Sequence, residues 1–504
     1  MYSVHAEAPS PPCPEPFNLA GHVLACAPEA GARAALKVLN PDGGAEVWGY
    51  DRLEAAVRGT ATGLLRAGLA PGDRVLLRLG NTPGFPVAFL GAIAAGLIPV
   101  PTSSQLTRAE ISRMAAGLDP ALVIAGEGIA LPDHPAPVLS EAVLRGFEAL
   151  PPANYVLGAP DRLAYLVFTS GSSGQPRAVM HAHRAIWARR MMIDGWYGLR
   201  ADDRLLHAGA FNWTYTLGTG LMDPWSVGAT ALIPGPGVTS LQLPALLCAH
   251  EATIFAAAPG VFRQMLRTPG ALTLPDLRHG LSAGEALPGS VRKGWNTATG
   301  TMIYEALGMS ECSTFISGSP ARPAPDGSAG YPQPGRRIAV LDAAGQPVAR
   351  GTSGVLAVHR SDPGLFLGYW RADRETAARF AGEWFITGDM VSMAPDGAIT
   401  YLGRDDDMMN AGGYRVSPLE VEAALALHEQ AGEVAAVELR VKADTSVIAA
   451  FYTGSATPEA LAAHAKGCLA RYKQPRIFRH IAVIPKNANG KINRRALRDL
   501  KEAP

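Results

Sequence analysis

Cysteine is scarce in this sequence, and neither sign of charge is in excess. The five cysteines are widely scattered, and they form no CxxC pair or nearby histidine spacing that would suit zinc. Lys and Arg together number 45 and Asp and Glu number 44, which leaves a formal net charge of +1. The cysteine pattern favours a reduced, cytoplasmic setting, and the balanced charge gives no electrostatic footprint for nucleic acid or an anionic membrane. We therefore expect a small-molecule ligand.

No apolar stretch of the sequence is long enough to cross a membrane. The most apolar run, residues 85–101, is interrupted by Gly91, Gly96 and Pro99, and it falls short of the ~20 residues that a span needs. We interpret this run as part of the core. The N-terminal segment lacks a basic start followed by an apolar stretch, so we expect no secretory signal.

The length of the chain, 504 residues, exceeds the ~250–300 residues at which one core usually stops growing, so we expect two or more domains. Short apolar runs alternate with amphipathic segments along it. The runs typical of strands are residues 74–79, 163–168, 229–233, 252–257 and 301–304. The segments typical of helices include residues 184–197 and 287–297. This order predicts βαβ units around parallel sheets, and thus an α/β fold.

The character of the sequence changes near Gly403. The segment GRDDDMMNAGGYRVSP, residues 403–418, is polar and carries glycines, and a new helical pattern begins at its end. A domain boundary is expected at such a point. We predict a large N-terminal domain over residues 1–403 and a small C-terminal domain over residues 404–504.

A strand-like run leads directly into a loop of hydroxyl groups and glycines, TSGSSGQPRA at residues 169–178. The hydroxyls can donate hydrogen bonds, and Gly171 and Gly174 allow backbone N–H groups to approach an anion closely. A loop in this position after a strand forms a phosphate cradle. The alternative is a flexible surface connection. The loop is not a Walker A motif, because GxxxxGK[ST] occurs nowhere in the chain.

This loop resembles the signature loop of the adenylate-forming superfamily, which includes acyl- and aryl-CoA synthetases, luciferases and the adenylation domains of peptide synthetases. Arg177 stands where the family usually has lysine, and Ala178 stands where it has glycine. An arginine still clamps a phosphate, with a planar fork rather than a point charge. The ATP-binding residues that the resemblance implies here are Thr169, Ser170, Gly171, Ser172, Ser173, Gly174 and Arg177.

A second segment, SAGEAL at residues 282–287, resembles the adenine-side motif of the same superfamily. The resemblance implies further ATP contacts at Gly284, Glu285 and Ala286. This segment follows the glycine-rich loop in the order that the family has, as do four further segments, at residues 304–311, 382–389, 403–422 and 485–495.

A third segment, YEALGMSE at residues 304–311, resembles the family pattern [ND]xYGxTE. The resemblance implies adenine contacts at Glu305 and Gly308. It also implies that Ser310 is a catalytic residue on the α-phosphate and that Glu311 is a magnesium ligand. Taken alone, Glu311 would be interpreted as an ordinary solvated carboxylate.

A fourth segment, GEWFITGD at residues 382–389, resembles the family's GWxxTGD. The resemblance implies that Asp389 accepts hydrogen bonds from the ribose hydroxyls of ATP. A carboxylate suits a vicinal diol because its two oxygens can accept from both hydroxyls at once.

The polar segment at residues 403–422 resembles the family's hinge and the start of its small domain. The resemblance implies that Arg404 is a catalytic residue that contacts the nucleotide and that Asp406 is the pivot of the hinge. It implies CoA-binding residues at Gly412 and Gly413. The alternative is a polar surface loop followed by a helix cap.

The last segment, PKNANGKINRR at residues 485–495, resembles the family's C-terminal loop PxTxxGKxxR. Lys491 matches the catalytic lysine of that loop. The alternative is a solvated basic cluster, since three arginines lie nearby in the sequence. Gly490 before the lysine and an isoleucine after it favour the catalytic loop.

The resemblance spans nearly the whole chain and implies the fold in outline. It implies a large N-terminal domain with parallel-strand-rich sheets flanked by helices, joined by a hinge to a small, mobile α+β domain. It implies ATP, Mg²⁺ and coenzyme A, with a carboxylate attacking the α-phosphorus to form acyl-AMP and then acyl-CoA. No general base is needed because the carboxylate is already ionised near pH 7, so we expect His181, His183 and His207 to be structural or surface histidines.

Residues 211–230, FNWTYTLGTGLMDPWSVGAT, bear on which carboxylic acid is the substrate. They resemble the corresponding region of benzoate-type CoA ligases. The resemblance implies that Trp213 gates the acyl pocket and that Tyr215 lines it. The other implied pocket residues are Ala258, Gly308 and Met309. The alternative for the aromatic residues is core packing. GGYRVSP is closer to medium-chain acyl-CoA synthetases, so a compact aromatic acid and a medium-chain acid both stay open.

Other functions share parts of these motifs. A stand-alone enzyme that loads a carrier protein in trans, or a luciferase-like oxygenase, would use the same adenylation step, and a product assay separates them. A non-enzymatic binder of nucleotide or acyl-AMP stays open because of the departures at Arg177 and Ala178, and because Leu307 stands where the family pattern has tyrosine. The oligomeric state, including a homo-oligomer, also stays open.

Overall fold

The structure is a computed structural model that describes residues 1–7, 11–170, 176–267, 272–405, 407–411, 414–442, 445–486 and 490–500. Seven predicted site residues lie outside these ranges, namely Gly171, Ser172, Ser173, Gly174, Asp406, Gly412 and Gly413. The side chain of Ser170 also lies outside the description. Within the described ranges, no helix has both the length and the apolar character that a membrane crossing requires.

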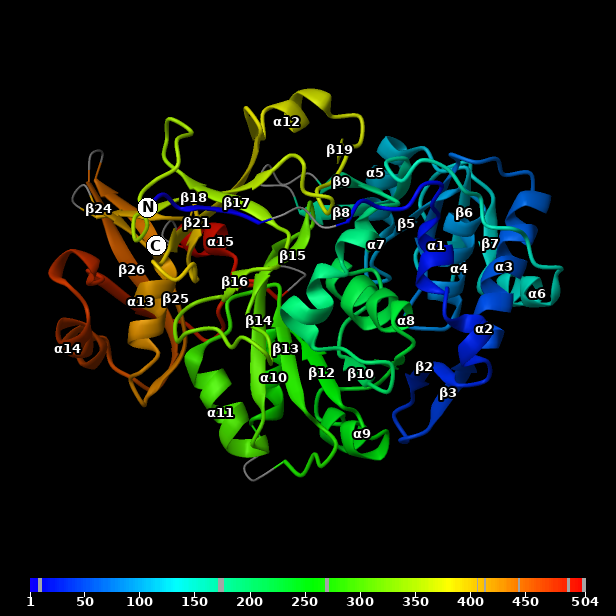
Figure 1. The fold of residues 1–504 in the computed structure, drawn as a ribbon. Coiled ribbons are helices and arrows are strands. Elements are labelled where there is room, and N and C mark those ends of the chain that lie inside the picture. Colours follow the sequence, from blue (N-terminus) through cyan, green and yellow to red (C-terminus); the bar gives the residue numbers. More distant parts are fainter. Residues whose placement is uncertain are drawn as a thin grey trace.

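The largest sheet has nine strands and lies at the lower centre of Figure 1. In order across the sheet these are β16 (Tyr331–Pro332), β15 (Ser313–Ser317), β14 (Met302–Met309), β13 (His279–Ala283), β12 (Ile254–Ala257), β10 (Arg204–His207), β11 (Thr230–Pro234), β2 (Ala34–Leu39) and β3 (Ala45–Gly49). Neighbouring strands run parallel from β14 to β2, and antiparallel strands complete both edges. The predicted α/β class is therefore confirmed.

One face of this sheet is covered by three helices, α9 (Leu243–Ala249), α10 (Pro259–Met265) and α11 (Gly289–Thr299). Leu206 and Phe255 project from the strands on this side and pack with Trp295 of α11. All three side chains are almost fully buried. Their burial from water supplies the main free energy that holds the helices on the sheet.

The opposite face is covered by residues 184–226, and the segment 184–197, which we expected to be helical, is helical over most of its length but irregular. The helix α7 (Ala185–Ala188) is short, and a wider π-helical turn, η2 (Ile193–Tyr197), follows it. The turn directs both Trp196 and Tyr197 into the core, where both are fully buried. A second π-helical segment, η3 (Thr216–Met222), covers the same face.

A second, fully parallel sheet has four strands, ordered β5 (Ile98–Pro101), β4 (Arg74–Arg78), β6 (Leu122–Ala125) and β7 (Val138–Ser140). The helix α4 (Gly84–Ala94) packs against this sheet and against α3 (Tyr50–Arg66). Every residue of α4 and β5 is buried. The interpretation of residues 85–101 as core is therefore confirmed.

The remaining sheets of the large lobe are antiparallel. One contains β1 (Val4–Ala6), β17 (Arg337–Leu341), β18 (Ser353–His359), β21 (Trp384–Met393), β20 (Phe380–Ala381) and β22 (Ile399–Arg404). The other contains β19 (Gly368–Tyr369), β9 (Pro176–Ala182) and β8 (Leu163–Ser170). Strands β8 and β9 flank the glycine-rich loop on its two sides.

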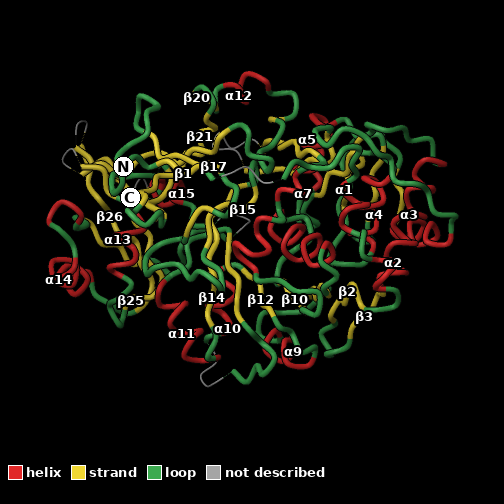
Figure 2. The backbone as a smooth tube through the Cα atoms, viewed as in Figure 1, coloured by secondary structure: helices red, strands yellow, loops and turns green. Residues whose placement is uncertain are grey.

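The C-terminal part of the chain gathers at the left of Figures 1 and 2. Its described elements are β23 (Met409–Ala411), β24 (Tyr414–Val416), α13 (Pro418–Leu425), β25 (Ala431–Lys442), β26 (Thr445–Gly454), α14 (Pro458–Cys468), β27 (Ile477–His480) and α15 (Arg494–Asp499). Strands β25 and β26 form a long antiparallel pair, and the apolar faces of α13 and α14 pack on it. This arrangement is the expected small α+β unit.

Candidate active site

Several predicted site residues lie at one edge of the nine-stranded sheet. Strands β12, β13 and β14 are parallel, so their carboxyl ends meet at the same edge. Ala258 directly follows β12, Gly284 directly follows β13, and Ser310 directly follows β14. Ligands of open α/β sheets bind outside the carboxyl ends of the strands, so this edge is the candidate active site.

The predicted adenine-side segment meets the predicted acyl gate. Gly284 is exposed and has a positive φ of +97°, a backbone conformation that favours glycine. A Cβ atom at this position would lie 2.8 Å from Cζ2 of Trp213. The indole of Trp213 therefore lies directly on the backbone of Gly284, and the two predicted subsites are adjacent.

Tyr215 is part of the wall behind this contact. Its ring lies edge-on to Trp213 and to His207, with centroid separations of 5.3 Å and 4.3 Å. Its hydroxyl donates to the carbonyl of Leu281 at 3.1 Å, and the side chain is almost fully buried. Burial raises the pKa of Tyr215 well above its ordinary value, so the phenol is neutral. Core packing therefore explains much of its position.

Gly308 and Met309 lie at the irregular end of β14. The ladder between β14 and β15 shifts register at Gly308. A Cβ on Gly308 would lie 2.4 Å from the carbonyl oxygen of Ser313, so the close approach of the two strands requires glycine. Met309 is half-buried and packs against the large core cluster.

The carboxylate of Glu305 is bound by other groups of the protein. It accepts a hydrogen bond from the backbone N–H of Leu287 at 2.8 Å and pairs with Arg292 at 2.9 Å. Burial raises the pKa of Glu305 to about 7, although both partners oppose that rise. The side chain thus fixes the end of the segment that carries Gly284 and Ala286, both of which are exposed.

Ser310 and Glu311 lie on the tight connection between β14 and β15. The hydroxyl of Tyr369 donates to Oε1 of Glu311 at 2.7 Å, and the backbone N–H of Phe366 donates to the carbonyl of Glu311 at 2.8 Å. The Tyr369 ring also lies 5.4 Å from the guanidinium carbon of Arg177. Tyr369 therefore connects the predicted magnesium ligand to the glycine-rich loop. Sequence reasoning missed it because a tyrosine among apolar residues is typical of core packing.

The flanks of the glycine-rich loop face each other. Thr169 on β8 lies directly opposite Arg177 on β9 in the ladder. The guanidinium of Arg177 pairs with the carboxylate of Glu375 at 2.7 Å. Arg177 therefore stays beside the loop in the structure, held by an acidic partner that sequence reasoning did not identify.

The residues around Glu311 fit a magnesium ion that is shared with phosphate. Mg²⁺ binds oxygen, and in phosphate-transfer sites it usually takes one or two carboxylates and completes its shell with phosphate and water. Glu311 is a largely buried carboxylate whose oxygens can accept more than the one bond from Tyr369. Among the described residues, no group of three or more His, Cys, Asp or Glu side chains could hold a metal.

Asp389 and Arg404 form a second part of the site, from neighbouring strands β21 and β22. They lie opposite each other in the ladder, and Nη1 of Arg404 lies 3.1 Å from Oδ1 of Asp389. Arg404 also donates to the carbonyl of Thr387 at 3.0 Å. Burial raises the pKa of Asp389, and the charges of Arg404 and Lys491 oppose that rise.

Lys491 acts electrostatically on two carboxylates of the large lobe. Its charge lowers the pKa of Glu285 and of Asp389 against the effect of burial, so its ammonium group lies close enough to act on both carboxylates. Glu285 and Asp389 belong to the large lobe, while Lys491 follows the small α+β unit in sequence. The predicted lysine therefore acts on one residue of the predicted adenine-side segment and on the predicted ribose acceptor.

Glu433 on β25 connects the lobes beside Lys491. It pairs with Arg263 of α10 at 3.2 Å and with Lys486 at 2.8 Å. Arg263 comes from the large lobe and Lys486 from the small one. One carboxylate is thus shared by cations of both lobes.

The sequence GLSAG at residues 280–284 fits the GxSxG pattern of hydrolase nucleophiles. Ser282, however, lies inside β13 rather than at a strand-to-helix elbow, and it is fully buried. Its Oγ has no hydrogen-bond partner among the described residues. The geometry does not support a hydrolase at this position.

The three histidines without a predicted role are buried. His183 accepts a hydrogen bond from the backbone N–H of Leu19 at 3.0 Å, and His181 stacks on Tyr165 with a centroid separation of 4.8 Å. Burial lowers the pKa of His181 to about 4, and those of His183 and His207 to about 3. All three are neutral at pH 7, as structural histidines are.

Two segments of the chain match known protein families. Residues 26–370 match the AMP-binding enzymes, and residues 420–491 match the C-terminal domain of AMP-binding enzymes. Together these matches include the glycine-rich loop, the edge of the large sheet and Lys491.

Individual relatives match over nearly the full chain. The benzoate–CoA ligase of Thauera aromatica is 31% identical, and the match covers 98% of this chain and 99% of the relative. The human mitochondrial acyl-coenzyme A synthetase ACSM2A is 29% identical, over 96% of this chain and 91% of the relative. The solved structure of a benzoate CoA ligase from Burkholderia xenovorans LB400 superimposes with a TM-score of 0.85 at 30% identity, covering 96% of this chain and all of that chain.

Proposed function

The chain belongs to the family of AMP-binding enzymes, and from this membership we propose that it is an ATP-dependent ligase for an aromatic or similarly compact carboxylic acid. The acid is activated as an acyl-AMP, and the acyl group is then transferred to CoA. The observation that carries the proposal is the contact of the Trp213 indole with the backbone of Gly284, which sets the predicted acyl gate against the predicted adenine-side segment.

A carboxylate needs activation because oxide is a very poor leaving group, whereas AMP leaves readily. The acid's carboxylate oxygen attacks the α-phosphorus of ATP, and pyrophosphate departs. The task of the protein is to orient the reactants and to stabilise charge on the α-phosphate. Magnesium bound at Glu311 would neutralise charge on the polyphosphate.

The roles that we propose for the site residues are those that the family resemblance implies. Arg177 and Ser310 approach the phosphates, and Lys491 stabilises charge where it develops during attack. Asp389 accepts from the ribose hydroxyls, and Arg404 orients Asp389 while contacting the nucleotide. The backbone at Gly284 and Ala286 receives the adenine.

We assign the location of the bound acid from the position of Trp213. Its indole lies on Gly284, so an acyl group at this position is adjacent to the adenine-side segment. The rings of Trp213 and Tyr215 leave room for a compact acid better than for a long alkyl chain. The names of the relatives from Thauera aromatica and Burkholderia xenovorans support an aromatic acid such as benzoate.

We also propose the two-domain mechanism that the resemblance implies. The division falls between residues 1–403 and 404–504, at the end of β22. Asp406 serves as the pivot, and Gly412 and Gly413 contact CoA once the small domain has turned. The free cysteines and the balanced charge favour a cytoplasmic location.

The test is pyrophosphate release with a panel of acids, with and without CoA. The panel contains benzoate, hydroxybenzoates, anthranilate and medium-chain fatty acids, and the thioester product is identified by mass spectrometry. We expect CoA-dependent turnover with an aromatic acid. A preference for the fatty acids would contradict the aromatic assignment. Adenylation without thioester formation would indicate a carrier-protein acceptor, and ATP binding without any turnover would indicate a nucleotide-binding sensor.

A further inference from the structure

The turn that carries Ser310 and Glu311 ends in a strained residue. Ser313 closes the turn with a φ of +62°, a left-handed conformation that is disfavoured for residues with a Cβ atom. Glycine would adopt this conformation without strain, but serine supplies a hydroxyl group. The surroundings of that hydroxyl explain how the conformation is held.

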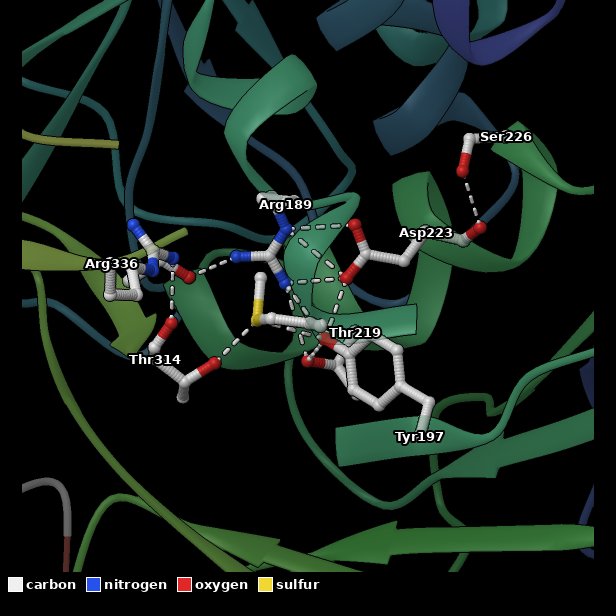
Figure 3. Close-up of polar contacts among 9 residues, drawn as sticks. Arg189, Tyr197, Thr219, Asp223, Ser226, Thr314 and Arg336 are labelled. Atoms are coloured by element: carbon white, nitrogen blue, oxygen red, sulfur yellow. Dashed lines mark hydrogen bonds and ion pairs between the residues drawn. The ribbon is translucent and has the colours of Figure 1, made fainter. Parts of the chain in front are cut away.

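The hydroxyl of Ser313 accepts a hydrogen bond from Nη1 of Arg189. Arg189 itself is held by Asp223, with Nε at 2.8 Å from Oδ1 and Nη2 at 2.6 Å from Oδ2. Figure 3 shows the guanidinium lying between Asp223 on one side and the neighbourhood of Thr314 on the other. Both members of the ion pair are almost fully buried. The planar guanidinium of Arg189 thus connects the carboxylate of Asp223 to Ser313, at the end of the Ser310–Glu311 turn.

The carboxylate of Asp223 is itself held by a hydrogen-bonded tyrosine. The hydroxyl of Tyr197 donates to its Oδ2 at 2.7 Å, and Thr219 lies 2.9 Å from the same hydroxyl. A Cβ atom on Gly218 would lie 2.2 Å from Nη2 of Arg189, so glycine at this position leaves the space that the guanidinium occupies. The segments η2 and η3 therefore both contribute to the placement of Arg189.

A second buried arginine holds the next residue of the chain. Nη2 of Arg336 donates to the carbonyl of Thr314 at 3.0 Å, and Nη1 donates to Asp362 at 2.6 Å. Arg336 and Thr314 are both drawn in Figure 3. Two buried ion pairs from different parts of the large lobe thus end on consecutive residues just after Glu311.

We propose that Arg189 is a positioning residue, which holds the Ser310–Glu311 turn in the geometry that the magnesium–ATP complex requires. The inference rests on the proposed function, because it assigns the nucleotide to this turn. A well-packed apolar pair is often at least as stable as a buried ion pair, so the pair is explained better by the geometry that it imposes than by stability. Lysine at this position would keep the charge, but it would lose the fork that reaches Asp223 and Ser313 together.

The test compares Arg189→Lys and Ser313→Ala with a matched control. Ser313→Ala removes only the acceptor hydroxyl and leaves the Arg189–Asp223 pair in place. The control is Arg278→Lys, which alters another carboxylate-bound arginine of the same lobe, 2.6 Å from Asp203. ATP binding is measured by calorimetry against Mg²⁺ concentration. Adenylation of benzoate and transfer of the acyl group from preformed benzoyl-AMP to CoA are measured separately.

We expect both test variants to raise the Mg²⁺ concentration for half-maximal ATP binding about tenfold and to lower adenylation by a similar factor. Transfer from benzoyl-AMP should stay within about twofold of wild type, and Arg278→Lys should leave Mg²⁺ dependence unchanged. In a Glu311→Gln background, Arg189→Lys should have little further effect on Mg²⁺ dependence.

An unchanged Mg²⁺ dependence in both test variants, or an equal loss in the two half-reactions, would overturn the positioning role. If the wild-type protein adenylates no acid, the proposed function fails. The calorimetric comparison still decides the role of Arg189 in that case, because it needs only ATP and Mg²⁺.

Discussion

Glu305 and Arg292 form an ion pair of 2.9 Å beneath the adenine-side segment, and Glu305 also accepts the backbone N–H of Leu287. The pair joins β14 to α11 and fixes the segment between β13 and that helix. Burial raises the pKa of Glu305 to about 7, so its charge changes within the range in which enzymes are usually assayed.

The first prediction concerns the pH dependence that Glu305 contributes to stability. Its pKa is higher in the folded protein than in the unfolded chain, so the folded state binds the proton more tightly. The favourable contribution is complete below the unfolded pKa and is lost as pH rises from about 4.5 to about 7. Glu305→Gln removes this dependence. We expect the wild type to lose up to about 3 kcal/mol relative to the variant over that range, as measured by urea unfolding. A difference that does not change with pH would contradict the assignment.

The second prediction concerns Lys491. Lys491→Ala should lower adenylation on the order of 10²–10³-fold, by analogy with the loss of one preorganised donor, while ATP binding changes less. The transfer of acyl from preformed acyl-AMP to CoA should be spared, because in the proposed two-domain mechanism the lysine loop leaves the site for that step. Single-turnover measurement of both half-reactions checks this. Lys466→Ala, on the exposed side of α14, is the control. Equal losses in both steps would rule out the two-conformation mechanism.

The third prediction concerns Trp213. Trp213→Ala should lower kcat/KM for benzoate by roughly 10–200-fold and should favour longer acids, because the indole limits the pocket beside Gly284. Competition between benzoate and a medium-chain fatty acid, followed by quantification of both thioesters, measures the shift. Phe211→Leu is a useful comparison, since Phe211 lies in the same segment but stacks on Phe85 in the core at a centroid distance of 5.2 Å. If Trp213→Ala and Phe211→Leu change the preference alike, Trp213 is a packing residue only.

The fourth prediction concerns Tyr369. Tyr369→Phe removes the hydrogen bond to Glu311 while keeping the ring beside Arg177. We expect the Mg²⁺ requirement of pyrophosphate release to rise about 10–100-fold, as is typical when the support of a metal ligand is lost. Glu311→Gln should have a larger effect in the same direction. No change in the Mg²⁺ titration of Tyr369→Phe would show that the phenol serves only packing.

The fold class and the family could be predicted because the relevant signals are local in sequence. The strand runs, the glycine-rich loop and the motif order lie in short contiguous segments, and the parallel sheets and the family match confirm them. The antiparallel sheet of β17, β18 and β21 was not predicted. The sheet pairs segments in which apolar and polar residues alternate only weakly. The period of apolar residues also does not reveal which strands become neighbours.

The supporting residues of the site could not be predicted for a related reason. Tyr369 reaches Glu311 across 58 positions of sequence, and Arg189 reaches Ser313 across 124. Neither lies in a motif, and a buried arginine or tyrosine has no local signal that distinguishes support of a site from support of a core. The roles given to Lys491, Asp389 and Trp213 stay predictions until the variants above are measured.

The carboxylate of Glu433 forms ion pairs with Arg263 of the large lobe and with Lys486 of the small one. Rotation of the small domain would therefore break one of these two ion pairs and keep the other. If the domain turns as proposed, the Lys486 contact travels with it and only the Arg263 contact breaks. A partly exposed pair of this kind stabilises by about 0–1 kcal/mol and is screened by salt. Ionic strength should therefore alter the balance between the closed and turned arrangements. The ratio of the two half-reaction rates, measured at about 0.05 and about 0.5 M salt, where the Debye length falls from roughly 14 to roughly 4 Å, checks this.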